Sequence, residues 1–122
     1  MERYLDVMKK SLELSETTLE GLFYIQTLFD NGKREDTGYL FDDVLLACTT
    51  IERTISQIIH ELDKEYILNI LIEIIELIEI VFVTFGAKDY DKVQKFLNST
   101  LIPSFSKLKE ELESAFRPYV IS

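Results

Sequence analysis

Residues that break helices and residues that carry catalytic chemistry are both scarce in this sequence. Its 122 residues include four glycines, two prolines, one cysteine and one histidine. A single cysteine cannot form a disulfide within the chain, and a single histidine cannot supply the pair of Glu-x-x-His motifs that a di-iron bundle needs. The scarcity of glycine and proline favours long helices. We therefore expect one all-α domain, large enough to bury a core without disulfides or metals.

Positive charge is scarce as well. Lysine and arginine total 13 against 22 aspartates and glutamates, which gives a formal net charge of −9. The acidic residues are spread over most of the chain, whereas binding to nucleic acid or to an anionic membrane surface needs a basic patch. Residues 1–16 are charged throughout and lack the uninterrupted apolar core of a secretion signal. These features exclude nucleic acid as a partner and predict a cytoplasmic location.

The longest apolar run covers residues 66–85, where fifteen of the twenty side chains are apolar. Glu73, Glu76 and Glu79 interrupt it at every third position. An apolar residue gains roughly 0.3 to 0.6 kcal/mol at the centre of a membrane helix and a charged residue costs about 2.5 to 3.5 kcal/mol, so three glutamates nearly cancel the gains. We therefore interpret the run as the central helix of a soluble bundle and predict no membrane insertion.

A change of hydrophobic phase divides the middle of the chain. No glycine or proline occurs from residue 39 to 85, so propensity alone would allow one continuous helix. The apolar stripe ends near residue 62, because its continuation would pass through mostly polar positions. A reversal of the chain at residues 62–65, with Asp63 as N-cap of the next helix, restores a common apolar face. The stripe has the spacing of a bundle helix and consists of Phe41, Val44, Cys48, Ile51, Ile55, Ile58 and Leu62.

Local signals place the remaining helix ends. Residues 30–32, Asp-Asn-Gly, suit a left-handed C-terminal cap, and Asp89 suits the N-cap of the last helix. Gly21 lies inside the first helix, where close packing against a neighbour would explain it. Pro103 is expected to kink or break the last helix, which Arg117-Pro118 ends. The four helices are predicted at about residues 3–30, 37–62, 64–85 and 89–117.

Short connections between these helices place sequential neighbours antiparallel, which gives an up-down-up-down four-helix bundle. In this arrangement Lys92 and Lys95 of the last helix would lie near Glu79 and Glu76 of the third helix, across a short turn. The third helix is expected to direct one face into the core, with Ile67, Leu71, Ile74, Ile78, Phe82 and Phe85.

The third helix carries more apolar residues than one core face requires. A bundle helix needs an apolar stripe only a little over 100° wide. A second stripe lies at the edge of the core face, so we expect it to form a homodimer contact or to bind a helical partner protein. The alternative is that the fourth helix, bent at Pro103, covers this stripe. The candidate interface consists of Leu68, Ile72, Ile75, Glu76, Glu79, Ile80 and Val83.

The acidic face of the same helix is the alternative functional site. Glu73, Glu76 and Glu79 could serve a small divalent-metal-dependent enzyme or ligand binder, but Mg²⁺ needs oxygen ligands that converge from more than one element. A spacing of three residues spreads these carboxylates over an arc, which favours a solvated face. His60 is expected at the surface near a helix end, and Cys48 as a buried, unreactive thiol. No catalytic, cofactor-binding or metal-binding residue is predicted.

Two segments resemble small uncharacterised helical domains from Gram-positive bacteria: LEGLFYIQTLFDNGKREDTGYLFDDVL and DYDKVQKFLNSTLIPSFSKLKEEL. The shared features are an aromatic-rich first helix, a turn with Asn-Gly, and a Leu-x-Pro in the last helix. The resemblance implies a helical bundle and brings no catalytic residues. A looser similarity to bacterial flagellar export chaperones lies in architecture alone. The expected function is a non-enzymatic interaction module, with an export-chaperone-like or regulatory adaptor as a further alternative.

Overall fold

The computed structural model describes residues 2–120 and contains no strand among them. The predicted all-α fold class is therefore confirmed. A π-helical turn joins the last two α-helices end to end, so the five α-helices form four rows. The elements in chain order are η1 (Glu2–Tyr4), α1 (Leu5–Asp30), η2 (Glu35–Thr37), α2 (Gly38–Glu61), α3 (Tyr66–Gly86), α4 (Tyr90–Phe96), the π-helical turn η3 (Leu97–Leu101) and α5 (Ile102–Val120).

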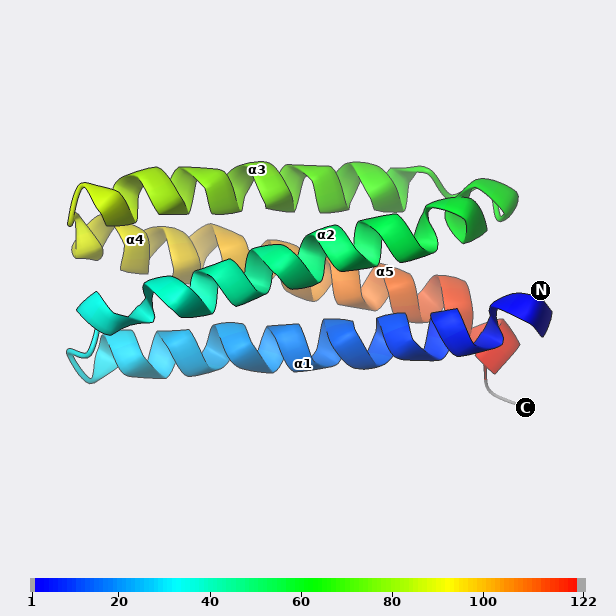
Figure 1. Cartoon of the computed structure of the whole chain (residues 1–122), viewed down its shortest axis with the longest axis horizontal. Helices are drawn as coiled ribbons and strands as arrows, with labels where there is room; N and C mark the ends of the chain where they lie inside the picture. Colours follow the sequence, from blue (N-terminus) through cyan, green and yellow to red (C-terminus); the bar gives the residue numbers. More distant parts are fainter. Residues whose placement is uncertain (1, 121–122) are drawn as a thin grey trace.

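The rows lie lengthwise beside one another (Figure 1). α1 contacts α2 and α5, α2 also contacts α3, and α3 contacts both α4 and α5. The first row and the third row are thus joined mainly through their neighbours. As a result, α1 and α2 form one seam of the molecule, while α3 and α4 form a different one.

One hydrophobic core runs between the rows and includes residues from all of them. The stripe predicted on α2 is buried from Phe41 to Ile58, as expected, and Leu62 at the end of the helix is half-buried. Burying a large aliphatic or aromatic side chain contributes roughly 1.5 to 3 kcal/mol. Packing of this stripe is therefore the main reason that α2 is stable in this position.

The core face of α3 differs from the prediction near its C-terminal end. Ile67, Leu71, Ile74 and Ile78 are buried as expected. Phe82 and Phe85 are only half-buried, and Val81 is buried in their place. Alternating steps of four and three residues keep side chains on one face, and Val81 follows Ile78 by three. Among the described residues, no helix combines the length and apolar content that crossing a membrane requires.

Two of the predicted caps are present. Gly32 has a φ of 75°, its N–H donates to the carbonyl of Phe29 at 3.1 Å, and the N–H of Lys33 donates to the carbonyl of Leu28 at 2.8 Å. This pair of bonds satisfies the last carbonyls of α1. At the start of α4, the side chain of Asp89 accepts from the N–H of Lys92 at 3.3 Å.

The predicted N-cap role of Asp63 is wrong. Asp63 has a φ of 56° and closes α2, because its N–H donates to the carbonyl of His60 and that of Lys64 donates to Ile59, both at 3.1 Å. Glu65 occupies the N-cap position of α3, without a side-chain capping bond. The C-terminus of α2 needs a left-handed residue, residues 62–65 contain no glycine, and aspartate tolerates this conformation better than most residues.

Two further expectations are wrong. Within residues 2–120, a Cβ on Gly21 would meet no atom within 4 Å beyond the neighbouring backbone of its own helix, so close packing does not explain this glycine. Pro118 does not end the last helix, because α5 continues to Val120. Proline removes the bond that would reach the carbonyl of Ser114, and Ser114 lies on the exposed side of α5, where water can hydrate that carbonyl.

Candidate functional site

The candidate interface on α3 divides into a covered part and an exposed part. Leu68 and Ile75 are half-buried and pack against the core. Ile72, Ile80 and Val83 keep 43%, 49% and 76% of their surface exposed. Large aliphatic side chains at this exposure are placed where a partner could cover them. We call Ile72, Ile80 and Val83, with the exposed Glu76 and Glu79, the α3 face.

A shallow depression lies at the C-terminal end of the α3 face. Its volume is about 500 Å³, and the fourth row reaches it with one residue, Lys92. Of the two lysines predicted near Glu76 and Glu79, Lys92 shares this depression with them and Lys95 is not among its lining residues. No ion pair joins Lys92 to either glutamate within residues 2–120. The depression combines two apolar side chains with charges of both signs. Its lining residues are Glu76, Glu79, Ile80, Val83, Thr84 and Lys92.

The glutamates of α3 do not assemble a metal site. Within residues 2–120, no three His, Cys, Asp or Glu side chains converge on a position that could hold a metal ion. Glu73, Glu76 and Glu79 are all exposed along one helix. A three-residue step turns about 300° around a helix, so each carboxylate points in a different direction from the one before it. The described residues therefore give the metal-dependent alternative no geometric support.

The only histidine and the only cysteine are placed as predicted. His60 lies mostly exposed at the end of α2, with its Nδ1 atom 3.3 Å from Oε1 of Glu65. Cys48 is fully buried in the core, and burial raises the pKa of its thiol to about 12. The reactive thiolate is therefore not formed at neutral pH.

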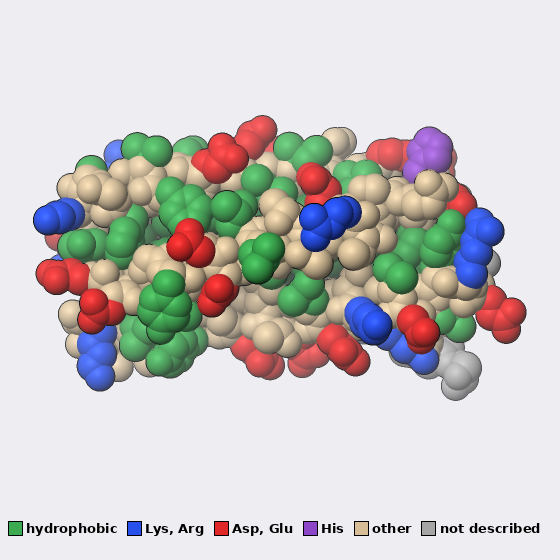
Figure 2. All heavy atoms as spheres, viewed as in Figure 1, with side chains coloured by type: hydrophobic (Ala, Val, Ile, Leu, Met, Phe, Trp, Pro, Cys, Tyr) green, Lys and Arg blue, Asp and Glu red, His purple; other side chains and the backbone are tan. Residues whose placement is uncertain are grey.

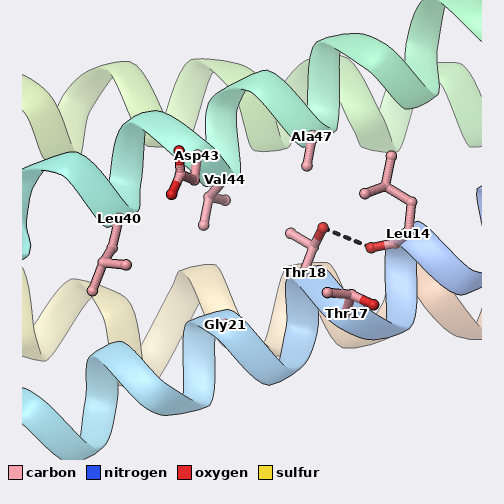
Figure 3. A pocket seen from close by; sticks show the side chains of 8 residues that line it. All are labelled: Leu14, Thr17, Thr18, Gly21, Leu40, Asp43, Val44 and Ala47. Carbon is pink, nitrogen blue, oxygen red and sulfur yellow. Dashed lines mark hydrogen bonds between the residues drawn. The ribbon is translucent and has the colours of Figure 1, made fainter.

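A second surface, which was not predicted from the sequence, lies along the seam between α1 and α2. Figure 3 shows a hollow into which side chains from both helices point, with Gly21 on the ribbon of α1. Its volume is about 280 Å³. The lining residues are Leu14, Thr17, Thr18, Gly21, Leu40, Asp43, Val44 and Ala47.

The hollow continues along the same seam. A second hollow of about 180 Å³ shares Leu14 with the first one. We call the two hollows together the α1–α2 groove. Its second part is lined by Val7, Lys10, Ser11, Leu14, Thr50 and Thr54.

The surface of the α1–α2 groove is mostly apolar, although several of its residues are polar. The hydroxyl of Thr18 donates to the carbonyl of Leu14 at 2.7 Å, and that of Thr54 donates to Thr50 at 2.9 Å (Figure 3 shows the first bond). These hydroxyls are satisfied within their own helices, so the groove does not need water or a polar ligand at these points.

The two helices that form this groove also carry exposed aromatic and aliphatic side chains. Figure 2 shows hydrophobic side chains gathered over the C-terminal end of α1 and the start of α2. Tyr24 is 55% exposed, while Tyr39 and Leu46 are each 63% exposed. Tyr39 and Leu46 adjoin the groove residues Leu40 and Ala47 in sequence. The signals available in the sequence were the helical Gly21 and the small residues opposite it, but only the pairing of the two helices brings them together.

Comparison with known proteins places the chain in a family. A family model with the description "Domain of unknown function (DUF8042)" matches residues 6–111. No curated protein and no solved structure matches the chain significantly. The expectation of a small uncharacterised domain family, drawn from the resemblance of two segments, is thereby confirmed.

Proposed function

We propose that this chain, which belongs to the DUF8042 family, is a non-enzymatic protein–protein interaction module that self-associates through its α3 face. The observation that carries the proposal is the exposure of Ile72, Ile80 and Val83 on a helix whose other side already packs in the core. Covering these side chains removes apolar surface from water, which is the main favourable term in protein association.

The charges around the depression favour a second copy as the occupant of the α3 face. A two-fold interface brings the same patch of both subunits together, so the patch must be complementary to itself. Lys92 lies beside Glu76 and Glu79 and forms no ion pair with them within residues 2–120. A two-fold axis near Val83 would allow Lys92 of one subunit to meet the glutamates of the other.

The scaffold that we propose is an up-down-up-down four-helix bundle whose fourth row bends in the turn before Pro103. Contacts between sequential rows and the short connections between them support this arrangement. The π-helical turn at residues 97–101 supports the bend, since sharp bends occur at π-turns and prolines. A bacterial origin and a cytoplasmic location stay predictions, and the single buried thiol suits a reducing compartment.

Sedimentation equilibrium at micromolar concentrations tests the proposal. We expect the wild-type chain to sediment with the mass of a dimer, and Val83→Glu and Ile72→Glu to sediment as monomers. Both sites are exposed, so circular dichroism should remain helical in both variants. Lys92→Glu should weaken the dimer by like-charge repulsion.

Leu46→Glu is the matched control, because Leu46 is an exposed aliphatic residue on a different helix. This variant should keep the dimer mass. A monomeric wild-type protein, or a Val83→Glu variant with the dimer mass of the wild type, would refute self-association through the α3 face.

A further inference from the structure

Among the described residues, neither the backbone conformation nor the packing of α1 requires a glycine at position 21. Gly21 lies within a regular helix, and the only described glycine with a positive φ is Gly32. An added Cβ would meet no atom of another described residue within 4 Å, apart from the neighbouring backbone of α1. Glycine in a helix interior lowers stability relative to alanine. Because Gly21 has no side chain, the surface of α1 is open at this position, and this open space forms part of the α1–α2 groove.

The length of the groove suits a helix. Its two hollows share Leu14 and extend from Val7 to Gly21 along α1. At a rise of 1.5 Å per residue, the fourteen steps from Val7 to Gly21 span about 21 Å, the length of a helix of about fourteen residues. Grooves between two helices with apolar walls bind amphipathic helices, which place side chains spaced by three and four residues into them.

Opposite charges at the two ends of the groove would fix the orientation in which a helix binds along it. Asp43 lines the hollow near Gly21, and Lys10 lines the hollow at the other end. Within residues 2–120, neither side chain forms an ion pair. Complementary charges at an interface fix its orientation and reject wrong partners. A bound helix would therefore carry a basic side chain near Asp43 and an acidic one near Lys10.

We propose that the α1–α2 groove binds one amphipathic helix of a partner protein, which places a large apolar side chain over Gly21 and a lysine or arginine beside Asp43. Tyr39 and Leu46, which adjoin groove residues in sequence, extend the contact beyond the groove. This site lies on α1 and α2, so it is independent of self-association through the α3 face.

A fluorescein-labelled peptide of about fourteen residues provides the probe. Its leucines are spaced alternately by three and four residues, with two lysines at one end and two glutamates at the other. We expect saturable binding to the full-length protein in fluorescence anisotropy. Gly21→Leu fills the hollow, so it should raise the Kd at least about tenfold, a loss that one excluded side chain can cause.

Asp43→Lys tests the same site without altering the floor of the groove, because Asp43 is exposed. This variant should bind the peptide several-fold more weakly. It should also bind a peptide whose lysines are replaced by glutamates more tightly than the wild type does. Val83→Glu is the control on the opposite seam and should bind the original peptide as the wild type does.

Three results would overturn the proposal. One is a Kd for Gly21→Leu equal to that of the wild type, with circular dichroism showing that the variant is folded. Another is the absence of any saturable binding of the peptide to the wild-type protein. The third is a fall in solution mass for Gly21→Leu or Asp43→Lys, which would make a second copy of this chain the occupant. Retention of the dimer mass with loss of peptide binding supports the proposal and leaves the α3 face as the separate self-association site.

Discussion

The ring of Phe85 on α3 meets the ring of Phe41 on α2 edge to face, with centroids 6.1 Å apart and an angle of 63° between the planes. Phe41 also meets Phe29 of α1 at 6.4 Å, and Phe85 meets Tyr90 of α4 at 5.2 Å. These edge-to-face contacts are favourable beyond the surface that they bury. The chain of four rings therefore joins all four rows at one end of the molecule.

Phe41→Ala should lower the free energy of unfolding by about 3 to 5 kcal/mol, because it leaves a cavity in the middle of this chain of rings. Urea denaturation followed by circular dichroism measures the loss. Phe23→Ala is the matched control, since Phe23 is 44% exposed and makes none of these ring contacts. It should cost about 1 kcal/mol or less. Equal losses for the two variants would contradict a central role for Phe41.

Gly21→Ala should raise the free energy of unfolding by about 1 kcal/mol, because alanine favours the helix and, within residues 2–120, the new methyl group would meet no atom beyond the neighbouring helix backbone. Gly38→Ala is the comparison. A Cβ there would lie 3.2 Å from Cε1 of Phe85, so the ring would have to move. Gly38→Ala should therefore gain less than Gly21→Ala. Thermal denaturation of both variants provides the test. A larger gain in stability for Gly38→Ala than for Gly21→Ala would show that the ring of Phe85 moves at little energetic cost.

Lys88→Gly should raise the free energy of unfolding by about 0.5 to 1 kcal/mol, because Lys88 holds a left-handed conformation that is costly for a residue with a Cβ. Its φ is 61°, and its N–H donates to the carbonyl of Phe85 at 2.9 Å where α3 ends. Lys88→Ala keeps the Cβ and should give no such gain. If alanine stabilised the protein as much as glycine in chemical denaturation, loss of the lysine side chain would be the cause.

Cys48 should make the stability of the protein fall at alkaline pH. Burial raises the pKa of its thiol from 9.0 to about 12, so the unfolded chain loses this proton first as the pH rises. Below about pH 9 both states keep the proton, and this group has no effect on stability. At pH 10 the loss amounts to about 1.4 kcal/mol.

The Cys48→Ala variant isolates this effect, because its cavity cost does not depend on pH. Between pH 8 and pH 10, urea denaturation should show the wild type losing about 1.4 kcal/mol more than the variant. The same slope for both proteins would show that the thiol ionises as easily in the folded state as in the unfolded state.

Regular spacing made the core of α2 predictable from the sequence. Its apolar residues follow alternating steps of three and four, and a helix can bury that stripe in only one way. Gly32 and Asp89 were predictable for a similar reason, since each acts through bonds to residues close by in the chain. Local chemistry was insufficient at Asp63, where the same residue type can open one helix or close another.

The α1–α2 groove could not be predicted from the sequence, because it depends on which turn of α1 faces which turn of α2. Gly21 was visible as an anomaly, but the sequence gives no distance between it and Asp43 or Ala47. The exposure of Ile80 and Val83 likewise depends on how far α4 extends over α3. One sequence therefore does not specify those features of the candidate site that depend on how two helices are aligned with each other.

The π-helical turn determines which changes in length the fourth row can tolerate. Val93, Leu97, Leu101 and Phe105 are all buried, yet they follow three successive four-residue steps. In a regular α-helix, three four-residue steps would rotate the direction of the side chain by about 120° around the helix. The wider π-helical turn compensates for this rotation, so all four side chains stay on the core side. The fourth row therefore contains a residue that a regular helix would not need. Relatives that lack one residue between positions 97 and 101 should keep the same core on the C-terminal side, whereas an inserted residue should rotate it out of phase.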